Sequence, residues 1–78
     1  MISGVVVASI PEHLSRVTEA VNSLPWASVH YSDSVGRLVV TVEADGVDDS
    51  IVRLELLQRL PNVLSASLAE YWLEDDEM

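Results

Sequence analysis

A chain of 78 residues has room for one small domain, which buries a smaller fraction of its surface than a large domain does. The absence of cysteine excludes disulfides, thiolate metal sites and cysteine nucleophiles. The net charge of -9, from 13 acidic residues against four arginines, argues against nucleic-acid and anionic-membrane partners and favours a basic partner, although acidity can also serve only to keep an apolar chain soluble.

The first residues lack the features of a targeting signal. Residues 1–5 carry no basic region ahead of their apolar run, and that run is too short for a secretory signal. No segment approaches the roughly 20 apolar residues that are needed to span a bilayer. We therefore expect a cytoplasmic protein that does not insert into a membrane.

The first third of the chain predicts a strand followed by a helix. Residues 2–9 are small or β-branched, as in a strand, and Pro11 marks the start of a helix that ends before Pro25. Ser9 and Glu12 have the spacing of a capping box. Apolar residues at intervals of three and four form one stripe of this helix, namely Leu14, Val17, Val21 and Leu24.

The middle of the chain predicts a β-hairpin. Residues 27–32 alternate apolar and polar side chains, as a half-buried strand does, and residues 33–37 supply turn-forming side chains. Residues 38–43 alternate in the same way. Asp45-Gly46 then ends the second strand of the hairpin.

The last part predicts a second helix and a fourth strand. Asp48 or Asp49 can cap the helix, and Pro61 ends it. Its buried stripe consists of Ile51, Leu54 and Leu57, widened by Leu56 and Leu60. The strand runs from Leu64 to about Leu73 and completes a domain over residues 1–73. Residues 74–78, of which the first four are acidic, are expected to be a disordered tail.

The two halves of the chain resemble each other. Sliding the sequence by 36 positions aligns Leu24-Pro25 with Leu60-Pro61 and Glu19 with Glu55. Two βαβ units joined by a hairpin give the split βαβ, or ferredoxin-like, arrangement. We therefore predict an α+β fold of order βαββαβ, with a four-stranded antiparallel sheet. Right-handed crossovers place both helices on one face of that sheet.

The sheet face that the helices leave uncovered is a candidate binding surface. Because side chains alternate along a strand, each strand has an inward and an outward set. The predicted inward set is Ile2, Gly4, Val6, Ala27, Val29, Tyr31, Leu38, Val40, Val42, Leu64, Ala66 and Leu68. The predicted outward set is Ser3, Val5, Val7, Ser28, His30, Val39, Thr41, Glu43, Ser65 and Ser67. Two alternatives remain: an ordinary solvated face, and edge strands that accept an extended peptide.

The sequence offers no catalytic or metal-binding constellation. His13 and His30 are expected to face solvent on different elements, and no hydrolase, phosphate-binding or zinc motif occurs. Asp45, Asp48 and Asp49 lack the later ligands of a calcium loop. With no acid, base or nucleophile placed in reach of another, we expect no enzyme, no metal and no cofactor.

Four segments show a pattern of residues that can be compared with known families. They are Ile2-Ser3-Gly4-Val5-Val6-Val7 followed by Pro11-Glu12, the Leu24-Pro25 step, Gly36-Arg37-Leu38-Val39-Val40-Thr41-Val42-Glu43-Ala44, and Leu60-Pro61-Asn62-Val63-Leu64-Ser65-Ala66-Ser67-Leu68. In order and spacing, the chain resembles the NapD family of cytoplasmic assembly chaperones for periplasmic nitrate reductase. The resemblance implies a ferredoxin-like fold. It also implies binding of the twin-arginine signal peptide of the molybdenum-containing catalytic subunit, which delays export until the cofactor is loaded.

The chain departs from the family pattern at three places. Trp26 and Asn62 stand where the family usually has glycine after the Leu-Pro steps, and Ala69-Glu70-Tyr71 replaces a Val-Tyr-His run. The turns after the two prolines are therefore expected to differ. Trp26, Tyr71 and Trp72 supply most of the aromatic area, and packing in the core or at a hairpin end is the default role, with ligand contact as the alternative.

The resemblance and the charge balance together predict a peptide-binding surface. A twin-arginine signal has a basic segment followed by an apolar one, and an acidic protein with a partly apolar sheet face complements both. The candidate residues are Val5, Val7, Val39, Thr41, Ser65 and Ser67 for apolar and polar contact, and Glu43 and Glu70 for the arginines. The alternative is a regulatory or dimerising ferredoxin-like module without a peptide client, whose mass would depend on concentration.

Overall fold

The computed structural model describes residues 1–72 of the chain, and the side chains of residues 1–69. The predicted tail, residues 74–78, lies outside this range. The elements in chain order are β1 (Ile2–Ser9), η1 (Pro11–His13), α1 (Leu14–Asn22), β2 (Ala27–Ser32), β3 (Arg37–Glu43), α2 (Val47–Gln58) and β4 (Val63–Trp72). Among the described residues, no helix is long and apolar enough to cross a membrane.

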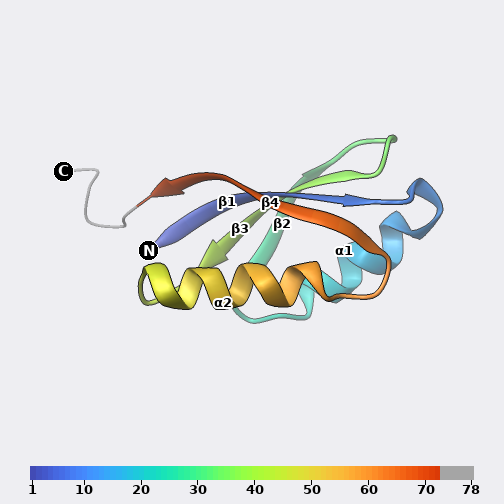
Figure 1. Cartoon of the computed structure of the whole chain (residues 1–78). Helices are drawn as coiled ribbons and strands as arrows, with labels where there is room; N and C mark the ends of the chain where they lie inside the picture. The colour runs from blue at the N-terminus through green and yellow to red at the C-terminus, as the bar shows by residue number, and fades with distance from the viewer. Residues whose placement is uncertain (73–78) are drawn as a thin grey trace.

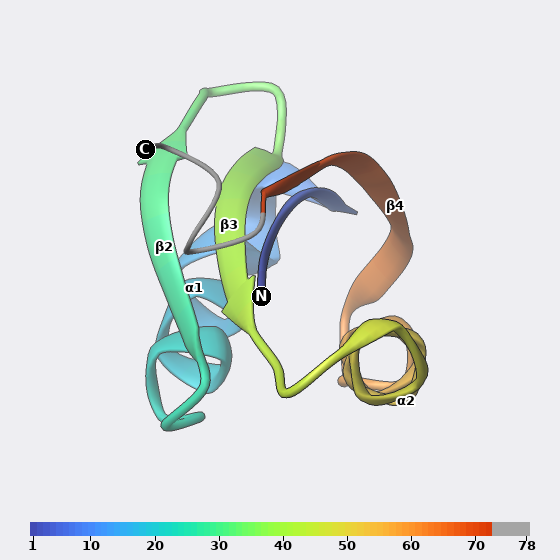
Figure 2. The ribbon, with the colours of Figure 1, turned by 90° about the vertical axis from the view of Figure 1, so that its left-hand side faces the viewer.

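The four strands form one antiparallel sheet in the order β2-β3-β1-β4. Both helices lie on the same side of this sheet, with α1 against β2 and α2 against β4 (Figure 1; Figure 2). The predicted βαββαβ fold is therefore confirmed. β2 and β4 are the edge strands, as expected from this topology.

The hydrophobic core lies between the sheet and the two helices. It is built from Val5, Val7, Val17, Val21, Ala27, Leu38, Val40, Val42, Leu57 and Ala66, all of them buried. Fully burying a valine or leucine side chain contributes about 1.5–3 kcal/mol before the cost of ordering the chain. The helices contribute only three of these residues, so the core depends mainly on the central strands β1 and β3.

The predicted orientation of β1 is wrong. Ser3, Val5 and Val7 are only 2%, 1% and 0% exposed, because they face the helices and not the open side. In the register, Val5 lies opposite Val40 and Val7 opposite Leu38, both of them core residues. A run of three valines carries no alternation, so only the 36-residue self-alignment indicated the orientation. The two halves also differ in their connections, since a 3₁₀ turn lies between β1 and α1 and none lies between β3 and α2.

Bulges in the edge strands overturn two more orientations. In β2, His30 is an extra residue between Val29, which pairs with Val40, and Tyr31, which pairs with Val39. Tyr31 therefore lies opposite the outward Val39 and is 61% exposed. Leu64 is the extra residue at a similar irregularity of β4, and it is 66% exposed. Leu68 pairs with Val5 on the inner side, as predicted, although it is 39% exposed.

Neither predicted helix cap forms. The Ser9 hydroxyl donates to the Ile10 carbonyl at 2.9 Å, and Pro11 begins η1 without a side-chain cap. The N-cap of α2 is Gly46, and Asp48 and Asp49 lie within the first turn. There their charges interact favourably with the positive end of the helix dipole.

Asp33 organises the loop between β2 and β3. Its Oδ1 accepts hydrogen bonds from the backbone N–H groups of Val35 and Arg37, both at 3.0 Å, and its Oδ2 accepts one from Arg37 Nε at 3.1 Å. The backbone hydrogen bond from Arg37 is the main cause that lowers the pKa of Asp33 below its ordinary value of 3.8. The charged form of Asp33 therefore stabilises the turn.

We expect Asp33→Asn to lower the midpoint of urea unfolding at pH 7. A carboxyl whose pKa is lower in the folded state stabilises the fold above its unfolded pKa, and this stabilisation is lost as the pH falls through the folded value. The difference between the variant and the native chain should therefore shrink as the pH falls below the ordinary carboxyl value of 3.8. Asp45→Asn removes the same charge elsewhere, and an equal pH effect in both variants would refute the role of Asp33.

Candidate functional site

The uncovered face of the sheet is crossed by one row of cross-strand neighbours. Tyr31 of β2, Val39 of β3, Val6 of β1 and Ser67 of β4 lie opposite one another in the register. Partners in a sheet share a face, so these side chains form a continuous strip on the side without helices. Tyr31 and Val39 are 61% and 41% exposed, and Val6 is half-buried. The centre of the open face is thus apolar and accessible.

Polar side chains border this apolar strip. Ser28 of β2 and Thr41 of β3 lie opposite each other, and Thr41 in turn lies opposite Gly4. The exposed His30, at the bulge of β2, has its Nε2 atom 2.7 Å from Thr41 Oγ1. This hydrogen bond ties the two side chains together, so both present polar atoms beside the apolar strip.

Charges of opposite sign mark the two ends of β3 on the open face. Glu43, opposite Ile2, lies at the C-terminal end of the strand, and Arg37, opposite Ala8, begins it. Arg37 is neutralised by its 3.1 Å ion pair with Asp33. Glu43 has no ion pair among the residues whose side chains are described. The open face therefore has an acidic end and a neutral end.

The structure places five of the eight predicted site residues on the open face. These are Val39, Thr41, Glu43, Ser65 and Ser67. Val5 and Val7 are buried under the helices, so their predicted placement on this face is wrong. The backbone of Glu70 lies opposite Gly4, but its side chain lies outside the described residues.

Sequence reasoning missed the residues that replace Val5 and Val7 on this face. Val6 and Ile2 take the outward positions of β1, and Tyr31 joins them through the bulge in β2. Each of these three residues is the cross-strand partner of an outward residue of β3. The alternating pattern in residues 38–43 was therefore the only feature of the sequence that could indicate their outward orientation. That signal requires the register, which the sequence alone did not supply.

A pocket adjoins the acidic end of the open face. Its lining consists of Pro25, Trp26, Glu43, Ala44, Asp45 and Arg53. The Glu43 backbone N–H donates to the Trp26 carbonyl at 2.8 Å, which joins the start of β2 to the end of β3. Glu43 therefore belongs to both the open face and the pocket.

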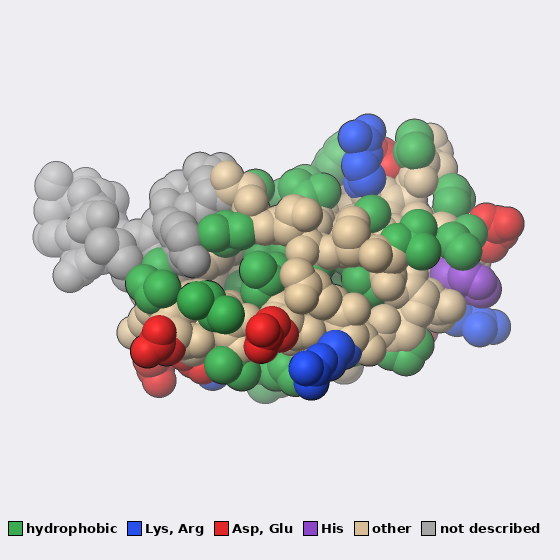
Figure 3. Space-filling model, in the orientation of Figure 1, with side chains coloured by type: hydrophobic (Ala, Val, Ile, Leu, Met, Phe, Trp, Pro, Cys, Tyr) green, Lys and Arg blue, Asp and Glu red, His purple; other side chains and the backbone are tan. Residues whose placement is uncertain are grey.

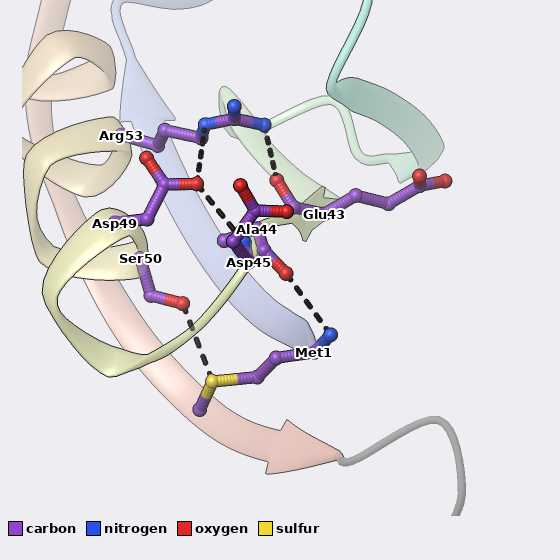
Figure 4. A network of polar contacts seen from close by, with 7 residues as sticks. All are labelled: Met1, Glu43, Ala44, Asp45, Asp49, Ser50 and Arg53. Carbon is purple, nitrogen blue, oxygen red and sulfur yellow. Dashed lines mark hydrogen bonds and ion pairs between the residues drawn. The ribbon is translucent and has the colours of Figure 1, made fainter.

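Arg53 reaches from α2 across this pocket. Its guanidinium carbon is 5.3 Å from the centroid of the Trp26 ring, within the range of a cation–π interaction. Its Nη1 donates to the Glu43 carbonyl at 2.6 Å, and its Nε pairs with Asp49 Oδ2 at 3.3 Å (Figure 4). The Asp49 carboxylate also accepts the Asp45 backbone N–H at 3.0 Å. The side chain of Arg53 is therefore held from both sides of the pocket.

The edge strand β4 is an alternative surface, because apolar side chains are also exposed there. Leu64 and Leu68 lie on β4, and α2 exposes Val47, Ile51, Val52 and Leu56. Figure 3 shows apolar side chains gathered on the side of the molecule that α2 and β4 form. Unlike the open face, this surface is divided between a helix and a bulged strand.

Comparisons with known proteins agree on one family. A family model described as NapD protein matches residues 1–71. Among solved structures, the chain is similar to the solution structure of the E. coli Tat proofreading chaperone protein NapD, with a TM-score of 0.84 and 28% sequence identity. That match covers 97% of this chain and 81% of the other. A comparison with curated protein sequences gave no significant match.

Proposed function

Because the chain belongs to the NapD family, we propose that it is a proofreading chaperone for an exported reductase. It binds the twin-arginine signal peptide of the catalytic subunit of periplasmic nitrate reductase and delays export until the cofactor is loaded. It acts by binding rather than by chemistry. A cytoplasmic location belongs to the same proposal, because a chaperone that delays export must meet its client before export.

The observation that carries this proposal is the open face itself. A twin-arginine signal presents two arginines and then an apolar stretch, and the face presents a carboxylate at one end and an apolar strip at its centre. Glu43 lies at the acidic end, and Tyr31, Val39 and Val6 form the strip. Apolar contact then supplies most of the affinity, and the net charge of -9 accelerates encounter with a basic peptide.

The alternative function, a ferredoxin-like module that dimerises, is less well supported by the net charge of the chain. Two copies that pack their open faces together would bring two chains of charge -9 into contact, and like charges oppose such an association. The same open face attracts a basic peptide. Sedimentation over a range of concentrations tests this alternative directly, because a dimer would show a mass that rises with concentration.

Calorimetric titration with a synthetic signal peptide tests the proposal. We expect the twin-arginine peptide to bind at about 0.15 M salt, and a peptide with both arginines replaced by alanine to bind at least about tenfold more weakly. Each arginine forms a charge-assisted hydrogen bond at a partly exposed site, and the removal of two such bonds accounts for a change of that order. Absence of binding, or equal binding of both peptides, would contradict the proposal.

A further inference from the structure

The pocket beside Glu43 has the chemistry of a guanidinium site. One wall is the indole ring of Trp26, and the rim carries the carboxylates of Glu43 and Asp45 together with backbone of β3 and the following loop. Aromatic rings and carboxylates are the two kinds of group that hold arginine side chains in proteins.

A guanidinium already lies in this pocket. The guanidinium carbon of Arg53 lies 5.3 Å from the centroid of the Trp26 ring. Its Nη1 donates to the Glu43 carbonyl (Figure 4). An aromatic ring and a backbone acceptor of this pocket are therefore both within reach of a guanidinium.

The charges of the pocket do not balance. The charge of Arg53 is compensated by Asp49 at 3.3 Å. Among the residues whose side chains are described, no cation pairs with the carboxylate of Glu43 or with that of Asp45. Both side chains are exposed, and the nearby Met1 ammonium, which donates to the Ala44 carbonyl at 3.0 Å, offsets only one of their two charges. The remaining negative charge at the rim favours the entry of one more cation.

We propose that this pocket binds one arginine side chain of the peptide partner through the Glu43 and Asp45 carboxylates, beside Arg53, which stays over the Trp26 ring. The inference rests on the proposed function in that the signal peptide supplies the arginine. The pocket adjoins the acidic end of the open face, so an arginine held there places the apolar segment of the peptide over Val39 and Val6. The pocket therefore selects the arginine, and the strip selects the apolar segment.

The pocket should discriminate arginine from lysine. A guanidinium is planar, stacks on an aromatic ring and presents several N–H donors in a fixed fork, whereas an ammonium is a compact, strongly hydrated point charge. Two carboxylates on one rim can each accept from a different edge of the fork. We expect a peptide with both arginines changed to lysine to bind about tenfold more weakly, although its charge is the same.

The first experiment uses a short probe that lacks the apolar segment. N-acetyl-Arg-Arg-amide is titrated into the ¹⁵N-labelled full chain, beside N-acetyl-Lys-Lys-amide. We expect the arginine probe alone to shift the Trp26 indole resonance and the Ala44 and Asp45 amide resonances. Equal shifts by both probes, or shifts spread over the whole acidic surface, would overturn the pocket. This outcome does not depend on whether the complete signal peptide binds.

The second experiment uses the complete peptide and two doubly substituted chains of equal charge. Glu43→Gln with Asp45→Asn should weaken binding about tenfold and remove the preference for arginine over lysine. Glu19→Gln with Glu55→Gln removes two exposed carboxylates from the helices and should change affinity less than about threefold. If the native chain binds the peptide but both pairs weaken it equally, the proposed function stands and the pocket is refuted.

Discussion

The Gly36→Ala chain is expected to be largely unfolded in water at about 25 °C. Gly36 has φ of +105°, in the region that residues with a side chain rarely adopt, and an added Cβ would collide with the backbone carbonyl oxygen of Ser9. The backbone of Pro11 is also close to the added atom, at 3.3 Å. Neither neighbour is a flexible side chain, so the strand ends themselves must move apart.

The size of this effect depends on the two segments that the glycine joins. The Ser9 backbone N–H donates to the Gly36 carbonyl at 2.7 Å, which ties the β2–β3 loop to the end of β1. Backbone strain and the loss of this hydrogen bond together should cost about 3 kcal/mol or more. A core in a chain of this size rarely supplies more than about 3–5 kcal/mol, so little stability remains.

Gly46→Ala is the matched control. Gly46 has φ of -175°, an extended conformation that any residue adopts, and an added Cβ would meet no atom within 4 Å. Its free energy of unfolding should change by less than about 1 kcal/mol. Urea titrations followed by circular dichroism measure both variants. A Gly36→Ala chain as stable as the Gly46→Ala chain would show that the loop does not constrain the sheet.

Gly36 also illustrates why the fold was predictable from the sequence. Glycine, the Asp33 turn before it and the alternating strand after it each indicate the same hairpin, and the prolines bound the helices on either side. Two such βαβ units can form one sheet with right-handed crossovers and with the apolar faces of both helices against it in only one arrangement. The element order, the sheet order and the covered face all follow from signals that are local.

The composition of the open face was less predictable because it depends on the register. Residues 5–7 are all valine, so the sequence does not say which of them faces the helices. The bulge that turns Tyr31 outward and the one that exposes Leu64 are features of strand pairing, and no residue type announces them. The pocket depends on α2 placing Arg53 over Trp26, which lies far away in the chain, in the connection between α1 and β2.

Val39→Asp is expected to weaken binding of the twin-arginine peptide about 100-fold while the chain stays folded. Val39 lies at the centre of the apolar strip, between Tyr31 and Val6. A carboxylate there has to lose water when the apolar segment of the peptide covers it, at a cost of about 3 kcal/mol. Because Val39 is 41% exposed, the free energy of unfolding should fall by only about 1 kcal/mol.

Two further aspartate variants separate position from charge. Val35→Asp adds the same charge in the β2–β3 loop, where Val35 is 65% exposed, and Leu64→Asp adds it on the edge strand β4. All three variants attract the peptide's arginines equally at long range, so only the loss of apolar contact distinguishes them. If Leu64→Asp weakens binding and Val39→Asp does not, the peptide pairs with the edge strand. If only Val39→Asp weakens binding, the open face is the surface on which the apolar segment lies.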